Sequence, residues 1–152
     1  MTKHLRLNIE ARTTDYPMER VFALTIHDDS VGEWTLGLLL LREGLIERLV
    51  VTSPQSALKI ELRLLASTAE HSRARSGWTD DSLELHVSGA ELDYWLRFFL
   101  KYVRDGYGEV DHLDVQTTSI DTAAVRPAAV VLKVERFTSP VSREDALRRL
   151  RQ

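Results

Sequence analysis

Apolar and polar residues alternate in several stretches of the chain, a pattern typical of β-strands that turn one face toward a hydrophobic core. In the first stretch, Leu5, Leu7 and Ile9 alternate with polar residues until Tyr16 and Pro17 break the pattern. Similar alternation predicts strands over residues 22–27, 58–64, 83–87 and 113–116, and an apolar run predicts another over 129–137. We expect the first two strands to pair as neighbours, because consecutive strands usually lie side by side.

Residues 33–52 fit two different structures. Their leucines have helical spacing, but the same leucines also fit a strand that is buried on both faces. Gly32, Gly37 and Gly44 would each weaken a helix by about 1 kcal/mol relative to alanine. Residues 42–44 would also suit a hairpin turn before the strand-like segment 48–52. We therefore expect a hairpin here, with a helix as the alternative.

The clearest helical pattern runs from about residue 89 to residue 105. Ser88 and Glu91 have the spacing of a capping box, in which each side chain satisfies a free backbone amide of the first turn. Gly106 supplies a C-terminal stop. The apolar side chains of this segment form one stripe that should pack on a sheet, and they are Leu92, Trp95, Leu96, Phe99 and Val103. Ser142 and Asp145 predict a second, short helix near the C-terminus.

The order of these elements predicts an α+β fold. We expect a mainly antiparallel sheet of about six to eight strands, with the helix at about 89–105 on one face and the short C-terminal helix at an edge. The 152 residues suit one domain, spanning 1–152.

The amino-acid composition excludes several kinds of functional site. The chain has no cysteine, which excludes disulfides, thiolate nucleophiles and cysteine-based metal sites, and fits a cytoplasmic protein. No apolar run reaches the ~18 residues of a membrane span, so no membrane association is expected. The net charge of −3 gives little support to nucleic-acid binding.

Sequence motifs of known enzymes are missing, so a non-enzymatic protein without catalytic residues or cofactors is favoured. An alternative is a small enzyme or a ligand- or metal-binding protein that uses histidines on the outward strand faces, namely His4, His27, His86 and His112. His112 and Asp114 point the same way on one strand and could act as base and orienting group. No metal site is expected, since at least three ligands from separate strands would have to meet.

Charge is concentrated between residues 77 and 121, which carry ten acids and three bases, a net charge of −7. A long polar connection at 66–82 overlaps the start of this stretch and contains Trp78, which is either a recognition aromatic or, more simply, a plug in the core. An acidic surface around an aromatic anchor would bind a basic protein. The expected partner-binding residues are Trp78, Asp80, Asp81, Glu109, Asp111, His112 and Asp114.

Residues 82–137 combine a strand, the turn at Ser88 and Gly89, the amphipathic helix, an acidic turn, His112 and Asp114 on a strand, and a closing strand. This layout resembles that of small immunity proteins of bacterial polymorphic toxin systems. The resemblance implies a non-enzymatic protein that binds and blocks a toxin. We therefore expect a protein-binding module. The most specific version of this hypothesis is an immunity protein or inhibitor. A structural subunit that self-associates through apolar surface, such as Leu38 to Leu41, is a further alternative.

Overall fold

Nine strands form one sheet in a computed structural model that describes residues 1–65, 73–107, 111–120, 126–135, 148 and 151. The order across the sheet is β1-β4-β5-β7-β6-β8-β9-β3-β2. The strands are β1 (Thr2–Arg6), β2 (Ile9–Asp15), β3 (Arg20–His27), β4 (Arg48–Ser53), β5 (Ser56–Leu64), β6 (Ala74–Trp78), β7 (Ser82–Val87), β8 (His112–Ser119) and β9 (Ala128–Glu135). Two α-helices, α1 (Val31–Arg42) and α2 (Gly89–Asp105), pack against it.

The sheet is mixed, so the prediction of a mainly antiparallel sheet of six to eight strands is wrong. Four antiparallel hairpins, β2-β3, β4-β5, β6-β7 and β8-β9, form the sheet locally. Wherever one hairpin meets the next the strands are parallel, in the pairs β5-β7, β6-β8 and β3-β9, and β1 also joins β4 in parallel. The predicted first strand is divided into β1 and β2, so its expected pairing with the second predicted strand is present only as β2-β3, while β1 pairs with β4. Local alternation predicts the hairpins but contains no information on how they are joined.

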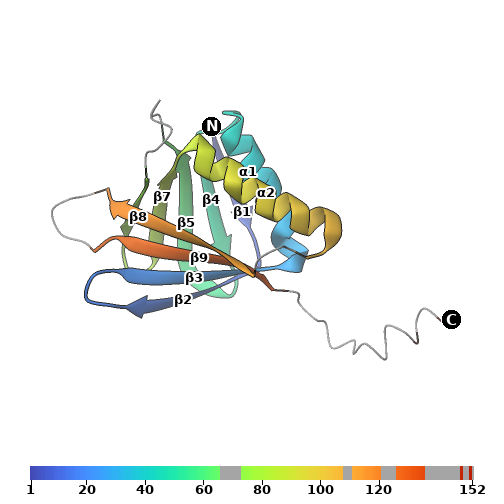
Figure 1. The fold of residues 1–152 in the computed structure, drawn as a ribbon, viewed down its shortest axis with the longest axis horizontal. Helices are drawn as coiled ribbons and strands as arrows, with labels where there is room; N and C mark the ends of the chain where they lie inside the picture. Colours follow the sequence, from blue (N-terminus) through green and yellow to red (C-terminus); the bar gives the residue numbers. More distant parts are fainter. Residues whose placement is uncertain (66–72, 108–110, 121–125, 136–147, 149–150, 152) are drawn as a thin grey trace.

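The sheet curls, because β1 and β2 follow one another in the chain but occupy its two opposite ends. The chain turns between them at Leu7 and Asn8. The Leu7 amide donates to the carbonyl of Thr52 at 2.9 Å, and the Asn8 amide donates to Ser30 Oγ at 2.9 Å. In Figure 1, β1, β4, β5 and β7 run upright while β8, β9, β3 and β2 run across the view.

Strand β6 lies within the segment 66–82 that the sequence analysis assigned to a polar connection, so that expectation is wrong at residues 74–78. The strand was missed because its core-facing side includes a serine. Ser76 is buried, and its hydroxyl accepts a hydrogen bond from the Ala128 amide at 3.0 Å and lies 2.6 Å from Thr117 Oγ1. These contacts join β6, β8 and β9 where the two halves of the sheet meet, and they offset the cost of burying the hydroxyl groups.

Residues 31–42 form helix α1, and the expected hairpin over 33–52 is therefore wrong in its first half. Gly37 lies where the helix approaches the sheet, since a Cβ there would come within 3.0 Å of Leu49 and 3.1 Å of Leu5. Gly44 has φ +72° and lies just beyond the helix end, where a left-handed residue ends a helix. Two of the glycines that argued against a helix thus position and terminate it.

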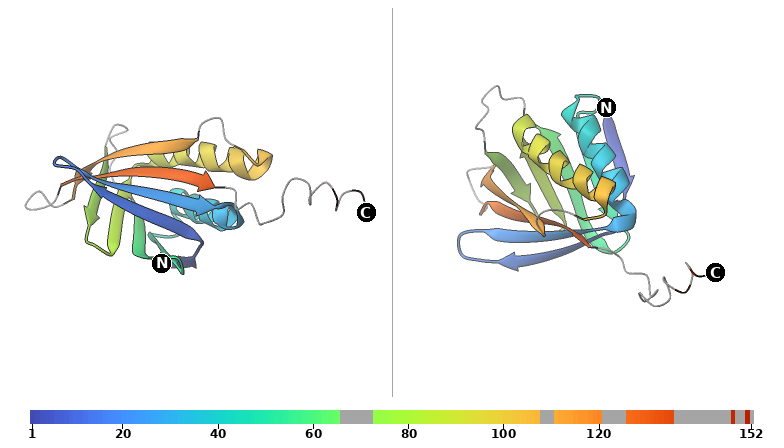
Figure 2. Two further views of the ribbon diagram at one scale, coloured as in Figure 1. Left: turned by 90° about the horizontal axis from the view of Figure 1, so that it is seen from below. Right: turned by 45° about the vertical axis from the view of Figure 1, so that its right-hand side comes forward.

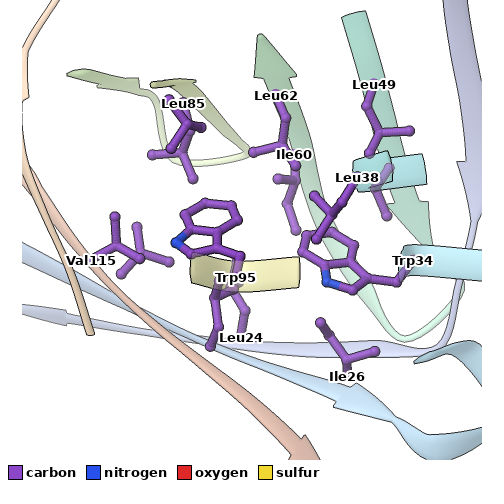
Figure 3. Packing of buried hydrophobic residues seen from close by; sticks show 14 of the residues in the cluster. Leu24, Ile26, Trp34, Leu38, Leu49, Ile60, Leu62, Leu85, Trp95 and Val115 are labelled. Carbon is purple, nitrogen blue, oxygen red and sulfur yellow. The ribbon is translucent and has the colours of Figure 1, made fainter. Parts of the chain in front are cut away.

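Helix α2 confirms the helical pattern at 89–105. Ser88 Oγ accepts a hydrogen bond from the Glu91 amide at 3.1 Å, and Gly106 ends the helix in the left-handed conformation. Trp95 is fully buried beneath α2, beside the Trp34 side chain of α1 (Figure 3). Val103, expected on the buried stripe, is instead exposed. The expected C-terminal helix falls mostly outside the described residues.

Candidate protein-binding surfaces

The two helices form an antiparallel pair on one side of the sheet (Figure 2). Arg42, at the end of α1, donates two hydrogen bonds of 2.8 and 3.1 Å to the carboxylate of Asp93, in the first half of α2. The arginine holds the pKa of Asp93 below its usual value, so the pair stays ionised at neutral pH. Trp34 and Phe99 pack edge to face between the helices, with ring centroids 5.9 Å apart. The pair therefore presents one continuous layer.

The outer surface of this layer is rich in exposed apolar side chains. We call it the helix face, and its apolar members are Leu36, Leu39, Tyr94, Leu100 and Val103. Each of these side chains is between 38% and 55% exposed. Leu36 and Leu39 lie on α1, whose sequence is apolar on nearly every side. A helix of that kind is usually buried all round.

A groove of about 630 Å³ runs along α2 on the side of β8. Buried Phe98 and Leu113 supply apolar surface, and the charged side chains among the described lining residues are all cations. Its lining residues are Tyr94, Arg97, Phe98, Leu100, Lys101, Arg104 and Leu113. The three cations are the only bases between residues 77 and 121, so the stretch that is net acidic in sequence has a basic groove in space.

Asp105 partly neutralises two of these cations, and Asp93 lies near the third, Arg97. Arg104 and Lys101 both bond to Asp105, at 2.9 and 3.3 Å, and these contacts, Arg104 first, lower the pKa of Asp105 to about 2. The carboxylate is therefore charged at neutral pH. Among the described residues, the three cations outnumber the two carboxylates that interact with them, Asp105 and Asp93, so this part of the rim has a net positive charge.

The opposite face of the sheet carries ion pairs on β4, β5 and β7. Glu61 is 9% exposed and accepts hydrogen bonds from Arg48 at 2.6 Å and Arg63 at 2.9 Å. These arginines, Arg48 first, lower the pKa of Glu61. Next to them His86 lies 2.8 Å from Glu84. These ion pairs bring opposite charges of β4, β5 and β7 together, whereas the helix face leaves apolar surface in water.

Trp78, Asp80 and Asp81 lie together at the turn between β6 and β7. The guanidinium of Arg20 stacks 3.9 Å from the Trp78 ring, and the indole Nε1 donates to the carbonyl of Arg126 at 2.8 Å. Trp78 is partly buried against the core, as the simpler hypothesis of a plug requires. Asp80 lies 3.3 Å from Arg20, so arginines offset the acidic charge at this end.

Asp111, His112 and Asp114 are exposed at the start of β8. His112 Nε2 lies 3.3 Å from Asp114 Oδ2, as their shared strand face predicts. Ser119 of β8 pairs with Ser76 of β6, so this end lies about 30 Å along the strands from Trp78, taking 3.3 Å per residue. The predicted site residues therefore form two separate groups, and Glu109 lies outside the described residues.

The outward histidines belong to β1, β3, β7 and β8, which are not neighbours as a set. His27 alternates with the core residue Ile26 and lies beside Glu10, so it keeps the predicted outward face, but it is only 4% exposed. It is the last residue of β3, and the corner at Asn8 and Ser30 covers it, with the His27 amide donating to the carbonyl of Asn8 at 3.0 Å. Glu10 Oε1 lies 3.7 Å from His27 Nε2. Among the described residues, no group of three potential ligands could hold a metal ion.

The helix face and its groove were missed by sequence reasoning. Arg97, Lys101 and Arg104 are spaced by four and three residues, which predicts one row on a helix, and this signal could have indicated the groove. The exposed leucines of α1 could not be recognised while that segment was expected to be a hairpin.

No protein-family model matches the chain, and no curated protein matches it in sequence. In the part of the chain that the structure describes, none of the helices has the length and apolar character needed to cross a membrane.

Proposed function

We propose that this protein is a non-enzymatic protein-binding module that uses the helix face. The observation that carries the proposal is the contrast between the two outer surfaces. Ion pairs occupy the open face of the sheet on β4, β5 and β7, whereas exposed leucines, a valine and a tyrosine lie on α1 and α2. Large apolar patches with polar rims are typical of interaction sites.

The partner is a polypeptide with apolar side chains of its own. Covering apolar surface contributes about 25 cal/mol for each Å² removed from water. The groove beside α2 adds a concave element, and anchors that enter such hollows dominate the binding energy of protein interfaces. A second copy of this chain would also bring apolar side chains to the helix face. The test must therefore distinguish self-association from binding to a different protein.

A more specific version of the proposal is that the protein is an inhibitor or immunity protein that acts in the cytoplasm. Its support is the order of β7, α2, β8 and β9, on which the resemblance to immunity proteins rests, and the lack of cysteine. A toxin gene beside the gene for this chain would strengthen this form.

The acidic surface is a second candidate for the contact with a basic partner. Asp111 and Asp114 favour it, because both are exposed and lie close together at the start of β8. Asp80 favours it less, since Arg20 lies beside its carboxylate.

Selection of random 16-residue peptides displayed on phage tests the binding function, with the full chain as bait. We expect enriched peptides to bind the native protein and to lose about tenfold or more in affinity for the variant Leu39→Glu/Leu100→Glu, because two new charges would enter the interface. Thr25→Glu/Thr52→Glu on the strands is the matched control and should leave binding unchanged.

Equal binding to the native protein and the helix-face variant would contradict the proposal, and so would a selection that enriches no peptide. Light scattering of the native protein at several concentrations tests whether a second copy of the chain, and not a different protein, covers the helix face. A dimer that the leucine substitutions dissociate would show that a second copy covers the helix face.

A further inference from the structure

We infer that the groove between α2 and β8 selects a partner segment that is amphipathic and acidic. This inference rests on the proposed function, and it names the chemistry of the segment that the module recognises. The groove offers three different features to such a segment: an apolar floor, an aromatic side chain and a row of cations.

The floor defines the apolar side of the ligand. Phe98 and Leu113 belong to the buried core and reach the groove from α2 and β8. Tyr94 and Leu100 are about half exposed and extend this apolar surface along α2. A volume of about 630 Å³ holds several side chains, which fits a segment with repeated apolar anchors better than a single inserted residue.

The cations define the polar side of the ligand. Arg97, Lys101 and Arg104 span seven residues of α2, which is about 10 Å at 1.5 Å per residue. Carboxylates three or four residues apart on a bound helix repeat over the same length. Such a segment would place its carboxylates against the cations while its apolar side faces Phe98 and Leu113.

Neighbouring acids do not cancel this preference. Asp105 bonds to Lys101 and Arg104, and Asp93 bonds to Arg42 at the junction of the helices and interacts more weakly with Arg97. On β8, His112 and Asp114 alternate with Leu113, so they project from the opposite face of the strand. None of the described acids of the 77–121 stretch is a lining residue of the groove, although exposed Asp111 precedes Leu113 by two residues on the same face.

A protein segment fits these features better than a nucleic acid or a lipid surface. Three cations beside two carboxylates, Asp93 and Asp105, form a small electrostatic footprint for a phosphate backbone, and the chain as a whole is acidic. The buried apolar floor has no role in contacting phosphates, whereas it suits apolar side chains.

Three synthetic 18-residue helical peptides with one shared apolar face test the inference. Their polar faces carry glutamate, glutamine or lysine, and fluorescence anisotropy measures Kd for the full-length protein at low and moderate salt. We expect the glutamate peptide to bind about tenfold or more tightly than the lysine peptide, with an advantage that shrinks as salt rises. Arg97→Glu/Lys101→Glu should abolish or invert this preference, and the neutral Arg97→Gln/Lys101→Gln should reduce it.

The control variant Arg12→Glu/Lys59→Glu changes charge equally on exposed positions of β2 and β5 and should keep the preference. Circular dichroism confirms that each variant is folded. No preference between glutamate and lysine peptides would overturn the inference, as would tighter binding of single-stranded RNA or of vesicles with anionic lipid. If phage-selected peptides still depend on Leu39 and Leu100 but ignore charge, only this inference fails; if they ignore both, the proposed function fails too.

Discussion

Three glycines around α1 have three different environments at the scale of single residues. Gly37 allows the helix to approach Leu49 and Leu5 of the sheet, and Gly44 takes a positive φ beyond the helix end. Gly32, in the first turn, has open space where a Cβ would be. Packing therefore requires a glycine at position 37 and helix termination favours one at position 44, whereas position 32 has no such requirement.

The first prediction compares Gly44→Ala with Gly32→Ala. Gly44→Ala should lower the free energy of unfolding by about 1 to 2 kcal/mol, because alanine is strained at positive φ. Gly32→Ala should be neutral or raise it by up to about 1 kcal/mol, because alanine favours a helix and nothing obstructs its methyl group. Urea denaturation measures both, and similar effects at the two positions would argue against the position of α1.

Glu61 provides the second prediction. Its pKa is lowered from 4.5 by Arg48 first and then Arg63, so its carboxylate stabilises the fold above pH 4.5, and that contribution is lost as the pH falls through the lowered value. Glu61→Gln should lower the free energy of unfolding at pH 7 by about 1 to 3 kcal/mol. The difference between native and variant protein should shrink below pH 4.5. A difference that stays constant from pH 7 to pH 3 would show that the ion pairs contribute nothing.

At the scale of elements, adjacent aromatic residues of α2 have opposite environments. Trp95 is fully buried, whereas Tyr94 is about half exposed on the groove. Trp95→Ala should therefore cost about 3 to 5 kcal/mol of stability, and Tyr94→Ala should cost less than about 0.5 kcal/mol. Thermal and urea unfolding measure the two effects. A near-neutral Trp95→Ala would contradict the docking of α2 on the sheet.

Sequence reasoning succeeded for elements whose signals are local. Ser88, the apolar stripe and Gly106 together define α2, and alternation identified β3, β5 and β7. It failed for α1, whose apolar residues surround the helix and leave no clear period, and for β6, whose buried side includes Ser76. Tertiary contacts outweigh local preference at both places.

For the molecule as a whole, parallel joints between hairpins decide the architecture. Hairpins such as β8-β9 form from neighbouring segments, but β3-β9 joins residues more than a hundred positions apart. The periodicity of apolar residues along the sequence contains no information on pairs between distant strands. The sequence therefore predicts only the local hairpins, which are antiparallel. The same non-local packing separates Trp78 from His112 and places Leu113 beside α2, so the acidic site could not be located from the sequence and the groove was missed.

The most direct test of the helix face as the binding surface is an NMR titration of the isotope-labelled full chain with the tightest phage-selected peptide. Chemical-shift changes should concentrate on the outer positions of α1 and α2, around Leu36, Leu39, Tyr94 and Leu100, and at Leu113 beside the groove. Changes confined to the open sheet face around Arg48 and Arg63, or to Asp111 and Asp114 at the start of β8, would contradict the assignment of function to the helix face.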